Sequence, residues 1–290
     1  MALFGTAFTS SKVVIGQIPH EVAAALRFGG GALVLLLLLS LRPGSVTFAW
    51  RDLVRAGSVG LMGVFAYNFF FFWGISLAPA IDGSIIVPVL SPVLTTITLL
   101  MTGHEKTSTI QAAGLALGVT GAVVFFIGIG GTGKGVTGSR LAGDFVFLLA
   151  AGCWAAYSIT SKKVLSGMEP LRATAYATGV GALALTVAAI PSVPRTDWAA
   201  VPAATWTNVG FLAVGPTAVA YLFYNQGLRS VSPITATLSM FAVPVFGAVS
   251  SVLFLGESIT AVQLAGALIT IVGAALAVTR GKSTRDAPSG

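Results

Sequence analysis

The chain has 290 residues, of which 55% are hydrophobic and only 9% are charged. Soluble domains carry about 25% charged residues, so this composition cannot cover a water-facing surface and excludes a soluble globular protein. The 16 Lys and Arg residues outnumber the 9 Asp and Glu residues, which gives a formal charge of +7. In a membrane protein this excess is explained by basic cytoplasmic loops, so we expect a lipid bilayer as partner and no nucleic acid.

Apolar segments recur along the whole chain, and each approaches the roughly 20 helical residues that a bilayer core requires. The loops between them are short and contain Pro and Gly, and none is long enough for a folded soluble domain. We therefore predict an all-α membrane protein with ten transmembrane helices, at 3–18, 22–41, 54–77, 83–102, 109–128, 144–164, 172–191, 206–228, 232–255 and 259–279.

Ten spans place both termini on the same side of the membrane. With the termini inside, the inner segments hold eleven Lys and Arg residues and the outer loops hold three, while Lys12 and Arg27 fall within spans. This bias predicts a multi-pass protein of the cell inner membrane with both termini in the cytoplasm.

The chain contains an internal repeat. Phe4-Gly5 aligns with Trp154-Ala155 at a spacing of 150, and a longer pattern recurs at a spacing of 152. Each copy has five spans, an odd number, so the second copy must be inverted relative to the first, as in many transporters. We predict a first repeat at 1–128, a linker at 129–143, a second repeat at 144–279 and a cytoplasmic tail at 280–290. The longer pattern pairs Pro92 with Pro244, Glu105 with Glu257, Gln111 with Gln263, Gly114 with Gly266 and Gly121 with Gly273.

Several short motifs stand in the same order in both halves: Phe4-Gly5-Thr6-Ala7-Phe8, Ala25-Leu26-Arg27-Phe28, Ser91-Pro92, Cys153-Trp154-Ala155-Ala156-Tyr157, Pro216 to Tyr221, and Val243-Pro244-Val245 followed by Leu255-Gly256-Glu257. In this order the chain resembles the EamA-type members of the drug/metabolite transporter superfamily. The resemblance implies ten helices, an inverted five-helix repeat, and a central cavity lined mainly by the first, third, fourth, sixth, eighth and ninth helices. Only Met1 to Leu3 precede the Phe4-Gly5 pair, fewer residues than in most members, so the first helix is expected to be marginal in length.

Charged residues inside spans are pointers to function, because an unpaired charge at membrane depth is unfavourable. Lys12 and Arg27 would either attract an anionic substrate group or serve structure, Lys12 by reaching the outer headgroups and Arg27 by tying its helix to a neighbouring backbone. We include Lys12 among the candidate substrate residues.

Acidic residues are absent from the middle of the predicted spans. Asp82, Glu105, Asp144 and Glu257 all stand near helix ends, which disfavours a four-helix type of proton-coupled multidrug pump, since such a pump needs a buried carboxylate. Loop capping and interaction with the helix dipole are the expected roles of Glu105 and Glu257.

Aromatic and amide side chains on the third, sixth and eighth predicted helices offer a pocket. Several of them stand three or four positions apart in the sequence, so they share helix faces. Facing a water-filled cavity, they would suit a polar aromatic or zwitterionic solute; the alternatives are packing between helices and contact with lipid at the interface, the role expected of Trp73. The candidate substrate-binding residues are Lys12, Tyr67, Asn68, Phe71, Trp154, Tyr157, Tyr221, Tyr224 and Asn225.

Prolines inside spans can kink a helix, because each removes a backbone hydrogen bond. Pro92 and Pro244 hold matching positions in the two repeats, and we predict that they act in gating; static packing kinks are the alternative.

No cofactor is expected. Gly128 to Gly135 is similar to a phosphate-binding loop, but it lacks the final Ser or Thr and follows a membrane helix instead of a strand, so a flexible linker is expected and ATP is not. His20 and His104 stand in separate loops and predict no metal site, and the single Cys153 excludes an intrachain disulfide.

These observations predict a secondary transporter, by resemblance an exporter of small organic metabolites such as amino acids, that works by alternating access. The alternatives are a transporter of another solute class (a drug, a nucleotide or a sugar derivative), a channel or scaffold subunit, and an intramembrane enzyme. Central paired catalytic groups are missing from the spans, so an enzyme is not expected. Proton coupling and the choice between monomer and homodimer stay open.

Overall fold

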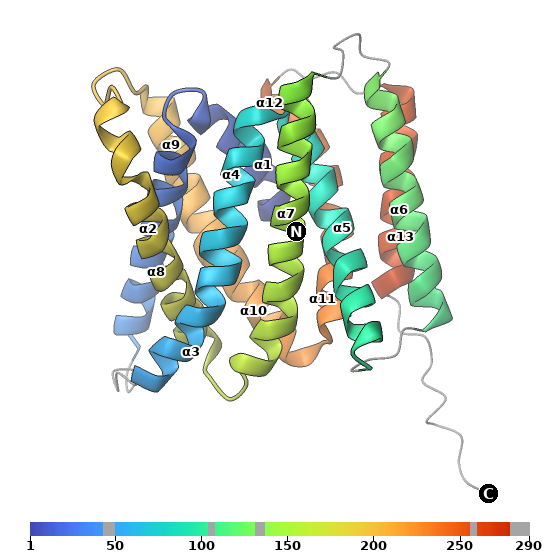
Figure 1. Cartoon of the computed structure of the whole chain (residues 1–290), viewed down its shortest axis with the longest axis horizontal. Coiled ribbons are helices and arrows are strands. Elements are labelled where there is room, and N and C mark those ends of the chain that lie inside the picture. The colour runs from blue at the N-terminus through green and yellow to red at the C-terminus, as the bar shows by residue number, and fades with distance from the viewer. Residues whose placement is uncertain (43–49, 104–107, 131–136, 256–259, 279–290) are drawn as a thin grey trace, which may run out of the picture.

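The computed structural model describes residues 1–42, 50–103, 108–130, 137–255 and 260–278, and all regular structure in these ranges is helical. The helices run roughly along one common direction (Figure 1). Glu105, Glu257, His104, the tail at 280–290 and residues 131–136 of the predicted linker lie outside the described residues.

The helices follow the chain order of the predicted spans. They are α1 (Ala2–Ile15), α2 (His20–Ser40), α3 (Trp50–Gly60), η1 (Leu61–Ala66), α4 (Tyr67–Leu77), α5 (Ala80–Met101), α6 (Thr109–Gly130), α7 (Gly138–Val164), α8 (Pro170–Ala189), η2 (Ile190–Arg195), α9 (Ala203–Leu212), η3 (Ala213–Val219), α10 (Ala220–Ser230), α11 (Pro233–Leu238), η4 (Ser239–Ala242), α12 (Val243–Leu255) and α13 (Ala261–Val278).

Seven helical segments of the described chain are long and apolar enough to cross a membrane: His20–Ser40, Trp50–Leu77, Ala80–Met101, Gly138–Val164, Pro170–Arg195, Ala203–Ser230 and Pro233–Leu255. Three shorter apolar helices stand at Ala2–Ile15, Thr109–Phe125 and Ala261–Gly273. The predicted all-α class is therefore confirmed, while the ten-helix inverted repeat stays a prediction.

Two long segments change their helical winding near the middle. The π-helical η1 joins α3 to α4, and the π-helical η3 joins α9 to α10. Such wide turns are frequently found at functional sites. Each of them stands next to candidate substrate residues, η1 just before Tyr67 and η3 just before Tyr221.

Helices α6 and α13 pack side by side at one edge of the bundle (Figure 1). Small residues let the two backbones approach closely, since a Cβ at Gly121 would lie 2.5 Å from the backbone nitrogen of Thr270, and one at Gly273 would lie 2.5 Å from that of Gly118. Glycines therefore serve helix contact here, as in other membrane proteins.

Helix α7 begins at Gly138, six residues before the predicted start at 144. The Thr137 side chain caps its first turn by accepting a hydrogen bond from the Arg140 backbone nitrogen at 3.2 Å. A polar contact stabilises this first turn, and a prediction from hydropathy does not detect such contacts, so it places the start of the helix too late.

Candidate functional site

Trp154 of α7 lies at the centre of a buried aromatic cluster and is only 1% exposed. Its ring centroid is 4.8 Å from that of Tyr67 on α4, 5.1 Å from Tyr224 and 5.6 Å from Tyr221 on α10. The cluster also takes in Phe4, Phe8, Phe71 and Tyr157. The structure thus brings the predicted aromatic residues together from several helices.

A first hydrogen-bond network joins α4 to α10. The side-chain nitrogen of Asn68 donates to the Val64 carbonyl at 2.8 Å and to the Tyr221 hydroxyl at 3.2 Å. The Tyr221 hydroxyl donates in turn to the Gly63 carbonyl at 3.3 Å. The side-chain oxygen of Asn68 is buried and has no hydrogen-bond partner among the described residues, so one acceptor in this network is unsatisfied there.

A second network joins α7 to α10 and α8. The Tyr157 hydroxyl donates to the Asn225 side-chain oxygen at 2.8 Å, and the Asn225 nitrogen donates to the Thr174 hydroxyl at 3.1 Å. The hydroxyls of Ser158 and Tyr224 share a hydrogen bond of 2.7 Å. These bonds satisfy the polar groups that burial would otherwise leave unpaired.

A small central cavity of about 10 Å³ lies within the aromatic cluster. This space holds about one water molecule, so the centre is closed in this structure. The lining side chains come from α1, α2, α4, α5, α7, α10, η4 and α12. They are Phe4, Ala7, Phe8, Arg27, Tyr67, Phe71, Val87, Trp154, Tyr221, Met240 and Val243.

Arg27 of α2 is a lining residue that the sequence-based list of candidates omits. It is 3% exposed, and its Nε donates to the side-chain hydroxyl of Thr217 at 3.1 Å instead of to a neighbouring backbone. The sequence feature that could have identified Arg27 as a site residue is its charge within a predicted span. The apolar lining residues Val87 and Met240 carried no sequence signal beyond their hydrophobicity.

Lys12 of α1 does not line the central cavity. Its Nζ donates to the backbone carbonyls of Ile75 at 2.8 Å and Ala78 at 3.1 Å, at the carboxyl end of α4. A cation in this position satisfies helix carbonyls and interacts favourably with the helix dipole. The geometry favours this structural role over both headgroup contact and substrate binding.

A buried ion pair lies near the same end of the bundle. The Arg140 guanidinium donates to the two carboxylate oxygens of Asp82 at 2.7 and 2.8 Å, and Asp82 is fully buried. Asp144 lies beside the Asp82 carboxyl. The pair ties the start of α7 to the start of α5, so this end of the bundle is held together by charge.

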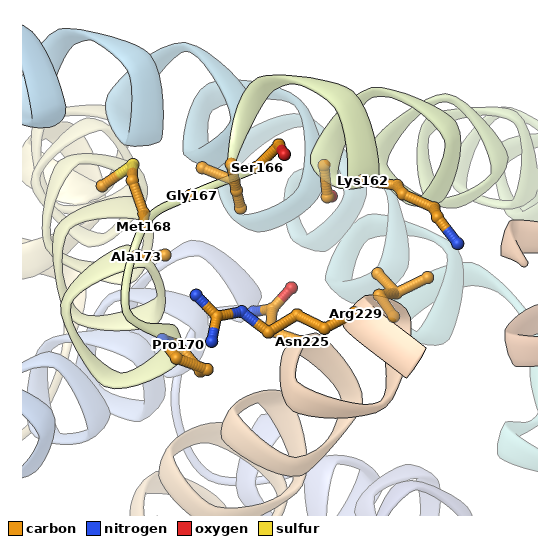
Figure 2. A pocket seen from close by; sticks show the side chains of 11 residues that line it. Lys162, Ser166, Gly167, Met168, Pro170, Ala173, Asn225 and Arg229 are labelled. Atoms are coloured by element: carbon orange, nitrogen blue, oxygen red, sulfur yellow. The ribbon is translucent and has the colours of Figure 1, made fainter. Parts of the chain in front are cut away.

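A larger cavity of about 420 Å³ opens at the opposite end of α7 (Figure 2). Lys162 and Arg229 supply positive charge to its walls, and Asn225 lies among its lining residues. Figure 2 shows the Arg229 side chain running across the cavity toward Pro170. Because Asn225 also bonds to Tyr157, the cavity reaches the edge of the aromatic cluster.

The two candidate gating prolines occupy different local structures. Pro92 lies inside the continuous helix α5, together with Pro88. Pro244 is the second residue of α12, a helix that directly follows the 3₁₀ turn η4. The helix therefore continues through Pro92, whereas the helical winding changes just before Pro244. A gating role for these two prolines stays a prediction.

A bundle of apolar helices around a buried polar and aromatic centre is consistent with a membrane transporter. The profile of the EamA-like transporter family matches residues 1–127 and 141–279, so the chain belongs to this family. The family that the sequence motifs predict is therefore confirmed.

Similar proteins are named as transporters. The chain is 27% identical to the uncharacterized transporter YyaM of Bacillus subtilis, with 93% of this chain and 88% of that protein covered. It is 26% identical to a probable terminal-alkyne amino-acid exporter of Streptantibioticus cattleyicolor, over 78% and 73% of the two chains. It is also 26% identical to the aromatic amino acid exporter YddG of Ancylobacter novellus, over 91% and 89%.

The fold is shared with a solved structure. A protein crystal structure aligns with a TM-score of 0.71 at 19% identity, covering 95% of this chain and 94% of the other. At this identity the likeness concerns the fold alone.

Proposed function

We propose that this protein is a secondary transporter that exports small organic metabolites such as amino acids by alternating access between two inverted five-helix halves. Both termini would lie in the cytoplasm. Two similar proteins are named as exporters of amino acids, which supports the direction and the substrate class. The separate family matches to residues 1–127 and 141–279 support the division into two repeats.

The observation that carries the proposal is the pairing of equivalent positions at the centre. Asn68 and Tyr221 stand 153 residues apart, the spacing at which Gly74-Ile75-Ser76 aligns with Gly227-Leu228-Arg229 in the second copy. They bond to each other. Phe4 and Trp154 stand 150 residues apart, and their rings meet edge to face at 5.7 Å. A site formed where two repeats meet is the usual location of the substrate in secondary transporters.

The asymmetry between the two ends of the bundle supports alternating access. One end is held by the Arg140–Asp82 pair and by Lys12, while the other end opens through a cavity of about 420 Å³. This volume lies within the range of small-molecule sites. By the predicted topology the open cavity faces the cytoplasm, so the solute would enter from inside, with Pro92 and Pro244 as the hinges.

Flux through purified protein in proteoliposomes tests this proposal. Vesicles loaded with radiolabelled L-tryptophan, L-phenylalanine or members of a metabolite panel are expected to release at least one solute with saturable kinetics. Comparison with and without a pH gradient measures proton coupling. Flux that does not saturate would indicate a channel, and no flux of any panel member would contradict transport.

Removing single polar groups from the first network is expected to weaken substrate affinity without loss of folded protein. Asn68→Ala and Tyr221→Phe each delete a hydrogen-bonding group, an effect of about 0.5–1.5 kcal/mol, or up to about tenfold in affinity. The half-saturation concentration of transport measures it. Asn208→Ala is the matched control, because Asn208 donates to the Ala204 carbonyl at the surface of α9. Wild-type affinity in both centre variants would remove these residues from the site.

A further inference from the structure

We infer that Arg27 binds a carboxylate of the transported solute, so that the substrates are carboxylates with an aromatic or large apolar group. The inference rests on the proposed transport function. The Arg27 guanidinium is buried at the middle of the bundle, and within the described residues its one hydrogen bond runs from Nε to the Thr217 hydroxyl. One of its terminal nitrogens, Nη1, is buried and has no hydrogen-bond partner in the part of the chain that the structure describes.

Within the described part of the chain, no carboxylate pairs with Arg27. The acidic residues there are engaged elsewhere: Glu21 with His20, Asp52 with Arg55 and Arg172, Asp82 with Arg140, Glu169 with Arg42, Asp144 beside Asp82, and Asp197 with the backbone of Ala200. A buried cation without a partner anion is strongly unfavourable. The guanidinium lies over the rings of Phe28, Phe71 and Phe72 at 4.8, 5.6 and 5.8 Å, and such contacts offset only part of this penalty.

The repeat shows that the fold itself does not require a cation here. The equivalent position, 150 residues later, is Ala177. Ala177 packs closely against Gly60 and is 2% exposed. An apolar residue can therefore occupy this place in the other half, so the Arg27 charge is explained better by a ligand than by packing.

The position of Arg27 specifies the ligand. It lines the central cavity with Tyr67, Trp154 and Tyr221, so an anion bound to it would lie against aromatic rings. A guanidinium matches the two oxygens of a carboxylate with paired donors. The unpartnered Asn68 oxygen, whose side chain bonds to the cavity-lining Tyr221, offers an acceptor for an ammonium group. One free donor and one free acceptor beside aromatic rings match the carboxylate and the ammonium group of an aromatic amino acid, which requires the cavity of about 10 Å³ to open during the transport cycle.

Binding and flux of three related probes test the inference. L-tryptophan carries the carboxylate, L-tryptophanamide lacks its charge, and indole-3-acetate keeps the carboxylate but lacks the amine. Dissociation constants come from calorimetry on purified protein, and flux comes from proteoliposomes. The wild type is expected to bind L-tryptophan at least about tenfold more tightly than its amide.

Arg27→Gln is expected to weaken L-tryptophan binding about 10–100-fold and to abolish the preference over the amide. Arg27→Lys keeps the charge without the paired donors and is expected to show an intermediate loss. Lys163→Gln removes a cation from the exposed end of α7 and serves as the control.

Two results would overturn the inference: equal binding of L-tryptophan and its amide by the wild type, or an unchanged preference in folded Arg27→Gln. The comparison of L-tryptophan with its amide uses only the wild-type protein, so it tests the inference even if Arg27→Gln does not fold. If the wild type transports L-tryptophan but Arg27→Gln keeps the preference, the carboxylate site fails and the proposed function stands. If indole-3-acetate binding depends on Arg27 but neither a probe nor any member of the metabolite panel is transported, the site stands and the proposed function fails.

Discussion

Trp154→Ala is expected to abolish transport and to lower the free energy of unfolding by about 3–5 kcal/mol, the usual effect of truncating a large buried aromatic residue. Trp154 contacts aromatic rings from α1, α4, α7 and α10, so its removal takes away the common packing partner of both halves. Denaturant titration in detergent micelles measures stability, and proteoliposome flux measures transport.

Trp73→Ala is the matched control for this change. Trp73 lies on α4 and is 38% exposed, with its ring against Phe69. The same truncation there removes less buried area and leaves the central cluster intact, so a smaller loss of unfolding free energy and transport near the wild-type rate are expected. An equal effect of the two substitutions, or full transport by folded Trp154→Ala, would contradict the central role of Trp154.

Gly60→Ala is expected to lower the free energy of unfolding by about 1–3 kcal/mol, the range for overpacking a closely packed contact. A Cβ at Gly60, the last residue of α3, would lie 2.1 Å from the backbone carbonyl oxygen of Ala177 on α8. Because the obstacle is backbone, the two helices must separate. Denaturant titration measures the loss.

Gly179→Ala is the control for this second prediction. Gly179 lies on α8 two residues beyond Ala177, and a Cβ there would meet nothing within 4 Å. Since Ala favours helix over Gly, stability is expected to be unchanged or slightly higher. Equal free energies of unfolding for Gly60→Ala and the wild type would contradict a close contact between Gly60 on α3 and Ala177 on α8.

Much of the fold could be predicted from the sequence, because long apolar runs separated by Pro and Gly define helices without knowledge of tertiary contacts. The aromatic and amide residues that gather at the centre were also predicted, from their spacing on helix faces. Their hydrogen-bond partners could not be predicted, since the bond from Tyr157 to Asn225 depends on how α7 and α10 pack. Sequence periodicity describes one helix at a time.

The charged residues were the hardest to interpret. Lys12 and Arg27 both stand within predicted spans, yet Lys12 binds the carbonyls at the end of α4 while Arg27 lines the central cavity. The early start of α7 could not be predicted either, because it involves the pairing of Arg140 on α7 with Asp82 on α5. These roles follow from neighbours distant in sequence.

Thiol accessibility at the closed centre tests the central claim of a path between the halves. Ala7 lines the central cavity and is 2% exposed, whereas Leu33 on α2 is 71% exposed on the outer surface of the bundle. In a Cys153→Ser background, Ala7→Cys is expected to react with a charged, membrane-impermeant methanethiosulfonate from either face of the membrane, and bound L-tryptophan is expected to slow the reaction. Leu33→Cys, facing lipid, is expected to stay unreactive. A transport-competent Ala7→Cys protein that reacts from neither face would contradict a path through this centre.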